Sequence, residues 1–280
     1  MNDAHPAGTT SPASGQDREL VVDSKFLQNL PKALRLSASD DEVGWRVLAD
    51  YGAVFVAHGG VAPPPDIVFP NERAVTEWQS GLKIQRLELD GIAVELQAPA
   101  AEALLAARRE ARARGLDISP RGRDAARRSY QDTVELWASR VNPGLAHWVG
   151  ARRLTKRESD RIRALPPREQ VPEILQLEAR GIFFSKDFSK SILYSVAAPG
   201  TSQHISMLAL DVTEHAILPV RALLARHGWY QTVVSDLPHF TFLGVAEEKL
   251  PALGLKRVQD SGRIFWIPDL GANRQGEGSR

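Results

Sequence analysis

The sequence predicts an α+β fold: one compact domain with an N-terminal elaboration. Apolar patterns of helical period alternate irregularly with short runs of strand type, without the regular strand–helix repeat of a parallel sheet. The Asp90-Gly91 pair lies between two alternating apolar runs, the usual signal for a β-hairpin. An alanine-rich segment, 99–114, begins at a proline and is followed by a glycine, as helices often are.

The expected helices follow from apolar residues three and four positions apart and from the residues that end helices. We expect them at 41–50, 72–79, 99–114, 122–141, 155–165, 168–180 and 214–227. His215 and His227 fall on the last of these segments, and we interpret both as surface positions.

The expected strands are short and apolar. They lie at 53–57, on both sides of Asp90-Gly91 within 87–94, and at 116–119, 208–212, 230–234, 240–243 and 263–267. Segment 61–70 contains four prolines, so we expect a loop there.

The two ends of the chain differ from its middle in composition. Residues 1–20 are rich in small and polar residues and predict a disordered lead-in, and 271–280 predict a disordered tail. Between them we expect an α/β elaboration, 21–98, packed on a main domain, 99–270.

The composition excludes several classes of protein. Of 280 residues, 43% are hydrophobic and 25% are charged, as in a soluble globular protein, and the net charge of +1 gives no strong field toward nucleic acid. The chain has no cysteine, which rules out disulfides, thiolate zinc ligands and cysteine nucleophiles. No apolar stretch approaches the ~20 residues of a membrane span.

An imidazole and a carboxylate stand close together in one apolar segment. Asp211 interrupts the apolar run 208–212, and buried carboxylates are rare unless they are paired or bound to a metal. His204 precedes this expected strand, and a loop after Pro199-Gly200 can bring its ring to the same point.

A second carboxylate–imidazole pair occurs beside another expected strand. Asp236 and His239 are three residues apart, and Pro238 stiffens the backbone before the histidine. His204, Asp211 and His239 together give three ligands with an open fourth position, as a catalytic zinc requires. Asp236 is then left as a carboxylate that can take the proton of a zinc-activated water and pass it to the leaving amine.

The run from Ser202 to Asp211 resembles the first signature of the zinc D-Ala-D-Ala carboxypeptidases and L-alanyl-D-glutamate endopeptidases, Ser-x-His-x-x-Gly-x-Ala-x-Asp. The second signature of that family, which is grouped with lysostaphin and the hedgehog fold, is an acidic residue three positions before a histidine. The resemblance implies that His204, Asp211 and His239 are zinc ligands. It also implies that Asp236 is the catalytic base.

Two departures from the family pattern affect the expected site. Met207 stands where the family usually has glycine, and we expect it to narrow or reshape the wall near the metal. Asp236 and Pro238 replace the glutamate and tryptophan of the carboxypeptidase branch, and the segment is similar to the phage endolysin branch, which cleaves L-Ala-D-Glu bonds.

The family also has an upstream arginine that binds the substrate carboxylate or the developing oxyanion. Arg121 follows the expected strand 116–119 and is our choice for this role, with Arg123 and Arg128 as rivals. A guanidinium group suits a carboxylate because its donors form a planar fork. We expect Arg128 and Ser202 to contact the substrate.

The resemblance implies a zinc-dependent peptidase of peptidoglycan stem peptides, first of all a D-Ala-D-Ala carboxypeptidase. An L-alanyl-D-glutamate endopeptidase, a D-dipeptidase and, from another class, a non-catalytic zinc-binding protein that recognises the cell wall remain open. The implied fold of 99–270 is a small antiparallel sheet that carries the zinc site between flanking helices.

The resemblance also implies partners and a compartment. The expected partner is a stem peptide or a D-amino-acid dipeptide, with no nucleic acid and no membrane span, and we expect a monomer. The family implies the cell envelope or periplasm, but the N-terminus lacks the apolar core of a signal peptide, which leaves the cytoplasm open.

Overall fold

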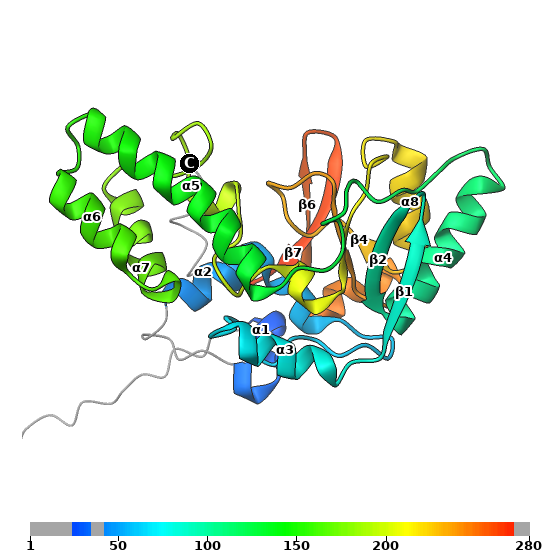
Figure 1. Ribbon diagram of the computed structural model, residues 1–280. Coiled ribbons are helices and arrows are strands. Elements are labelled where there is room, and N and C mark those ends of the chain that lie inside the picture. Colours follow the sequence, from blue (N-terminus) through cyan, green and yellow to red (C-terminus); the bar gives the residue numbers. More distant parts are fainter. Residues whose placement is uncertain (1–23, 35–41, 272–280) are drawn as a thin grey trace, which may run out of the picture.

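The computed structural model describes residues 24–34 and 42–271. Helices and small antiparallel sheets alternate irregularly along the chain, which confirms the predicted α+β fold (Figure 1). The predicted lead-in 1–20 lies outside the described residues, as does all of the predicted tail except Gly271.

Most of the predicted helices are present, and the sequence marks several of their starts. Asn71 accepts a hydrogen bond from the Ala74 amide at the start of α3, and Thr155 and Glu158 form a capping box at the start of α6. The helices are α1 (Lys25–Asn29), α2 (Glu42–Tyr51), α3 (Glu72–Ser80), α4 (Ala98–Arg112), α5 (Tyr130–Gly150), α6 (Lys156–Ala164), α7 (Pro167–Ala179) and α8 (Leu218–Arg226). Short 3-10 helices are η1 (Lys32–Leu34), η2 (Gly52–Val56), η3 (Ile192–Tyr194), η4 (Gln203–Ser206) and η5 (Glu247–Leu253).

The strands form two hairpins and one three-stranded sheet, all antiparallel. The strands are β1 (Ile84–Leu89), β2 (Ile92–Gln97), β3 (Ala209–Asp211), β4 (Trp229–Tyr230), β5 (His239–Phe242), β6 (Leu255–Asp260) and β7 (Arg263–Pro268). The predicted Asp90-Gly91 hairpin is β1–β2, and the three-stranded sheet has the order β3-β5-β4. Strand β6, which pairs with β7, was not predicted.

The helix predicted at 122–141 is wrong at both ends. Helix α5 begins at Tyr130, where Ser129 and Asp132 form a capping box, and continues through Pro143 to Gly150. The backbone of 122–129 instead hydrogen-bonds to other segments: the Ala125 carbonyl accepts from the Asp211 amide. Tertiary pairing therefore overrides the helix propensity of this alanine- and arginine-rich stretch.

Three other local predictions need correction. Segment 53–57 lies in the 3-10 helix η2 and not in a strand, since a short buried apolar run does not distinguish the two. Segment 116–119 is not a strand, and only its neighbour Pro120 forms an isolated bridge, to Val212. The last predicted helix begins at Leu218 rather than 214, so His215 lies in the turn before α8.

The two largest of the three hydrophobic clusters among the described residues organise the molecule. The larger joins α2, the β1–β2 hairpin, α4, β3, β5 and α8, so residues on both sides of the predicted boundary at 98 share one core. The smaller holds α5–α7 together around Trp137 and Phe184. Figure 1 shows α5–α7 at one end of the molecule and α4, α8 and the β1–β2 hairpin at the other. The division into domains at 98/99 stays a prediction.

No helix among the described residues is long and apolar enough to cross a membrane.

Candidate metal centre

The three-stranded sheet brings two of the predicted ligands face to face. Strands β3 and β5 pair so that Asp211 lies directly opposite His239. His204 lies in η4, one short turn before β3, and its backbone amide donates to the Ser202 hydroxyl at 3.4 Å. The turn and the two strands therefore deliver all three side chains to one place.

Met207 ends η4 in the left-handed conformation, with φ 54° and ψ 30°. This region favours glycine. Met207 stands at the position where the signature that it resembles has glycine, and its backbone conformation is one that glycine adopts most easily. The Met207 side chain is fully buried, and it does not line the pocket described below. Its departure from the family pattern thus affects the backbone and the core, and the expected change to the pocket wall is not seen.

Three candidate ligand atoms form a compact triangle. His204 Nε2 lies 3.1 Å from His239 Nδ1, His239 Nδ1 lies 3.3 Å from Asp211 Oδ1, and His204 Nε2 lies 3.4 Å from the same oxygen. Tetrahedral zinc with bonds of about 2.0–2.1 Å requires its ligand atoms to be about 3.3–3.4 Å apart. His204, Asp211 and His239 thus meet the spacing that zinc requires and could bind a metal.

Hydrogen bonds on the far side of each ring fix its tautomer. His204 Nδ1 lies 2.9 Å from the Ala126 carbonyl oxygen, and His239 Nε2 lies 2.9 Å from Gln203 Oε1. An oxygen acceptor places the proton on the nitrogen that faces it, so the other nitrogen of each neutral ring presents a lone pair. Two lone pairs and a carboxylate oxygen then converge on one point, and they repel one another unless a cation or a proton lies between them.

The protonation states favour a cation. Burial lowers the pKa of His204, so its ring is neutral at pH 7. Burial alone would raise the pKa of the Asp211 carboxyl, whereas the adjacent His204 and His239 rings hold it well below its usual value when they carry a proton toward it, and a cation at the same point acts in the same direction. Asp211 is therefore ionised, and the Arg128 guanidinium lies 3.5 Å from Oδ2, the oxygen turned away from the imidazoles.

Gln203 connects this centre to a buried polar network. Its side-chain nitrogen donates to the Tyr51 carbonyl oxygen at 2.7 Å, which orients its oxygen toward His239. The Thr241 hydroxyl also donates to that oxygen, and Thr232 and Thr241 hydroxyls lie 2.6 Å apart. Gln203 was not predicted as part of the site, because a lone glutamine has no characteristic spacing and its position beside His204 is the only signal in the sequence.

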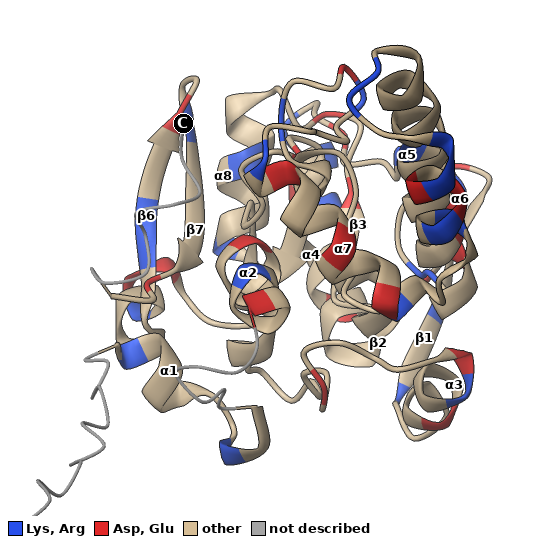
Figure 2. Ribbon diagram, turned by 90° about the vertical axis from the view of Figure 1, so that its left-hand side faces the viewer, with Lys and Arg blue, Asp and Glu red and all other residues tan. Residues whose placement is uncertain are grey.

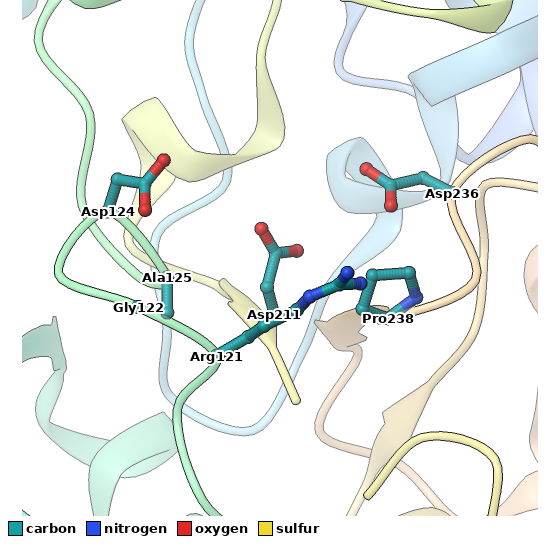
Figure 3. Close-up of a pocket in the computed structure, with 7 residues that line it drawn as sticks. All are labelled: Arg121, Gly122, Asp124, Ala125, Asp211, Asp236 and Pro238. Carbon is teal, nitrogen blue, oxygen red and sulfur yellow. The ribbon is translucent and has the colours of Figure 1, made fainter. Parts of the chain in front are cut away.

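A polar pocket of about 270 Å³ opens beside the triangle. Seven residues line it: Arg121, Gly122, Asp124, Ala125, Asp211, Asp236 and Pro238 (Figure 3). Asp236 is half-buried, and its backbone carbonyl accepts from the His239 amide at 3.2 Å, so one turn links the predicted base to a predicted ligand. The Asp236 carboxylate forms no ion pair within the described residues.

The arginines named from the sequence occupy different places. Arg121 lines the pocket, and its backbone amide donates to the Asp211 carbonyl oxygen at 2.9 Å. Arg128 is mostly buried against Asp211, and its Nε has no partner within the described part of the chain. Arg123 is exposed and does not line the pocket, nor does Ser202, whose hydroxyl caps η4.

Comparison with known proteins adds little to this geometry. No family model matches the sequence, and no curated protein matches it significantly. Among solved structures, the chain is similar to a crystal structure of a mutant of the vancomycin resistance D,D-pentapeptidase VanY, from a VanB-type resistance cassette, in complex with Zn(II). The match has a TM-score of 0.32 and 18% identity, and it covers 60% of this chain and 82% of that chain. A similarity this weak decides neither the fold nor the function of this chain. The fold is described from its helices and strands, and the function is argued from the geometry of the site.

Proposed function

We propose that this chain is a zinc-dependent peptidase of peptidoglycan stem peptides, with D-Ala-D-Ala carboxypeptidase as its first activity. The observation that carries the proposal is the triangle of His204 Nε2, Asp211 Oδ1 and His239 Nδ1, with the tautomer of both rings fixed and a polar pocket beside it. The resemblance of 202–211 and 236–239 to the two signatures of the zinc D-Ala-D-Ala peptidases supports the same reading.

His204, Asp211 and His239 would hold the zinc ion, and Asp211 also lines the pocket. A bound zinc ion supplies Lewis acidity, which lowers the pKa of water and polarises the carbonyl under attack. Asp236 is the carboxylate in the pocket that is neither a ligand nor ion-paired among the described residues, so it is free to accept a proton from water and return it to the leaving amine.

The arginines have distinct proposed roles. Arg121 lies on the pocket wall, and we assign it to the substrate carboxylate, which its planar fork can bind with two hydrogen bonds. Arg128 lies 3.5 Å from Asp211 Oδ2, the oxygen turned away from the imidazoles, and the substrate contact expected of it stays a prediction, since it does not line the pocket. The substrate contact expected of Ser202 stays a prediction, since its hydroxyl already accepts from His204.

The endopeptidase and dipeptidase activities use the same groups and differ in the peptide that the pocket accepts. The cell envelope is the compartment that fits this substrate, and a monomer carries all three ligands on one chain. A non-catalytic zinc-binding protein would also need the three zinc ligands, but its function would not depend on the Asp236 carboxylate.

The test is digestion of stem peptides by the zinc-loaded protein, with products identified by mass spectrometry. We expect release of the terminal D-Ala. His204→Ala should lose both zinc and cleavage, whereas His227→Ala, which removes a ring bound to Glu110 on α4, should keep both. Zinc binding without cleavage of any stem peptide would favour the recognition protein over the peptidase.

A further inference from the structure

Two arginines from distant elements converge on one short loop outside the metal centre. Arg221 of α8 donates through Nη1 to the carbonyl oxygens of His215 and Ala216, at 3.1 and 2.8 Å. Arg263 of β7 donates through Nη1 to the same His215 carbonyl oxygen at 2.8 Å. Two guanidinium groups therefore meet at a single backbone carbonyl.

Among the described residues, no carboxylate forms an ion pair with the arginines at this loop, and Glu214, in the loop itself, accepts from the Ser119 amide and hydroxyl instead. Among residues 24–34 and 42–271, neither Arg221 nor Arg263 forms an ion pair, and neither does Arg121. Arg221 and Arg263 are half-buried, and their hydrogen bonds to the described part of the chain involve only Nη1. Their remaining donors are free to bind an anion from solution.

The electrostatics of neighbouring groups agree with a positive field. Burial and then Arg263 lower the pKa of Arg221. Burial followed by Arg263, Arg121 and Arg221 lowers the pKa of His215, and Asp236 acts in the opposite direction. His215 is thus neutral at pH 7 and lies close enough to all three arginines to sense their charge.

This loop adjoins the proposed active-site pocket. The Thr213 amide donates to the Ser119 carbonyl oxygen at 3.0 Å, and Pro120 bridges Val212, so the loop begins beside Arg121. On the other side, the Trp266 amide of β7 donates to Gln231, in the segment that leads to Asp236. In the view of Figure 2 the β6–β7 hairpin and α8 lie next to each other, and Arg263 of β7 reaches the loop that precedes α8. We call His215, Arg221 and Arg263 the cationic lip, and Arg121 of the pocket wall lies beside it.

Exposed apolar side chains flank the cationic lip. Ile217 and Leu218, which follow Ala216 at the start of α8, are 42% and 65% exposed. Cationic donors beside apolar surface suit an acidic group carried on an aliphatic stem. Asp124, Asp211 and Asp236 line the adjoining pocket and repel a polyanion, which limits the ligand to a small acidic group.

We propose that the cationic lip is a subsite for a side-chain carboxylate of the peptide substrate, away from the cleaved bond. The inference rests on the proposed peptidase function and adds a specificity to it. Arg221 and Arg263 are positioned by the His215 and Ala216 carbonyls and bind the carboxylate through their remaining N–H groups. A peptide that carries a carboxamide at the same position loses this charge-assisted pairing.

The kinetic test uses pairs of stem peptides that differ only by a side-chain carboxylate or carboxamide, with one pair for each residue of the peptide. One of these pairs should vary the side chain that reaches the cationic lip. For that pair, we expect Arg263→Gln and Arg221→Gln to raise the KM of the carboxylate peptide about tenfold or more, with kcat little changed. The KM of the carboxamide peptide should not change. Arg157→Gln, a change of an exposed arginine on the distant α6, is the control. Equal effects on both members of every pair would overturn the inference and indicate a structural role.

A binding test separates failure of this subsite from failure of the peptidase. N-acetyl-D-glutamate is titrated into zinc-loaded protein while the ¹⁵Nε signals of Arg221 and Arg263 are followed by NMR, with N-acetyl-D-glutamine as the neutral control. We expect shifts with the acid that are absent with the amide and are lost in Arg263→Gln. Such shifts without cleavage of any peptide would support the carboxylate subsite and refute the peptidase function. Cleavage without such shifts would support the peptidase function and refute the subsite. The thermal midpoint and zinc content of each variant show that it is folded.

Discussion

Gln203 provides a direct test of how the metal centre is held. Its Oε1 lies 2.9 Å from His239 Nε2, and this contact leaves Nδ1 free to face the other two ligands. Gln203→Leu keeps the approximate volume and removes the acceptor. His239 can then adopt either tautomer, and in one of them the nitrogen that faces Asp211 carries a proton and cannot bind zinc.

The expected loss can be estimated from the contacts. Removing the hydrogen-bond partner of a metal-bound histidine typically lowers metal affinity about 10–100-fold, or about 1.4–2.7 kcal/mol. Gln203→Leu also removes the side-chain N–H that donates to the Tyr51 carbonyl oxygen, which should cost about 1–3 kcal/mol of folding stability. Gln203→Glu keeps an acceptor for His239, so its zinc affinity should stay much closer to that of the wild type.

Two measurements check this prediction. Competition with a chromophoric chelator gives the zinc affinity, and ¹⁵N NMR of the metal-free protein reports which nitrogen of His239 carries the proton. Gln79→Leu is the matched control, because Gln79 is also buried and bonds to the Ile205 carbonyl oxygen, but it contacts no ligand. Wild-type affinity together with an unchanged tautomer in Gln203→Leu would refute the reasoning.

Three further predictions concern the base, a turn and a buried acid. Asp236→Asn should keep the zinc and lose about 10²–10⁴-fold in kcat, and unchanged turnover would remove the base assignment. Gly200→Ala places a Cβ 2.3 Å from the Phe69 carbonyl oxygen at φ +78°, so urea unfolding should show a loss of at least about 1–2 kcal/mol; a neutral result would contradict the turn geometry. Burial raises the pKa of Glu178, so the folded state holds a proton that the unfolded state releases from about pH 4.5 upward. The stability of the wild type relative to Glu178→Gln should therefore fall as pH rises above that value, and a flat difference in urea titrations would show that Glu178 is not the cause.

The sequence predicted the parts of the structure that depend on local pattern. Asp90-Gly91 predicted its hairpin because the turn residues and the alternating strands lie within one short segment. The spacing of His204, Asp211 and His239 predicted a shared site because each lies in or beside a short strand or turn of definite direction, and the structure brings the three together. The fit to zinc became clear only once the distances were known.

The parts that were not predicted depend on contacts between distant segments. The loop 122–129 has a helical composition, but its backbone is used by Asp211 and His204, which no local pattern reveals. Gln203 gains its role from a ring 36 positions away. The cationic lip likewise joins Arg221 and Arg263 through a carbonyl oxygen, a group that every residue carries.

The central claim is that His204, Asp211 and His239 bind one zinc ion, and a crystal structure of the zinc-loaded protein with anomalous scattering at the zinc edge tests it most directly. The account predicts one ion per chain, bonded to His204 Nε2, Asp211 Oδ1 and His239 Nδ1 at about 2.0–2.2 Å. An ion bound elsewhere, or none at full zinc loading while the three side chains keep their positions, would contradict it.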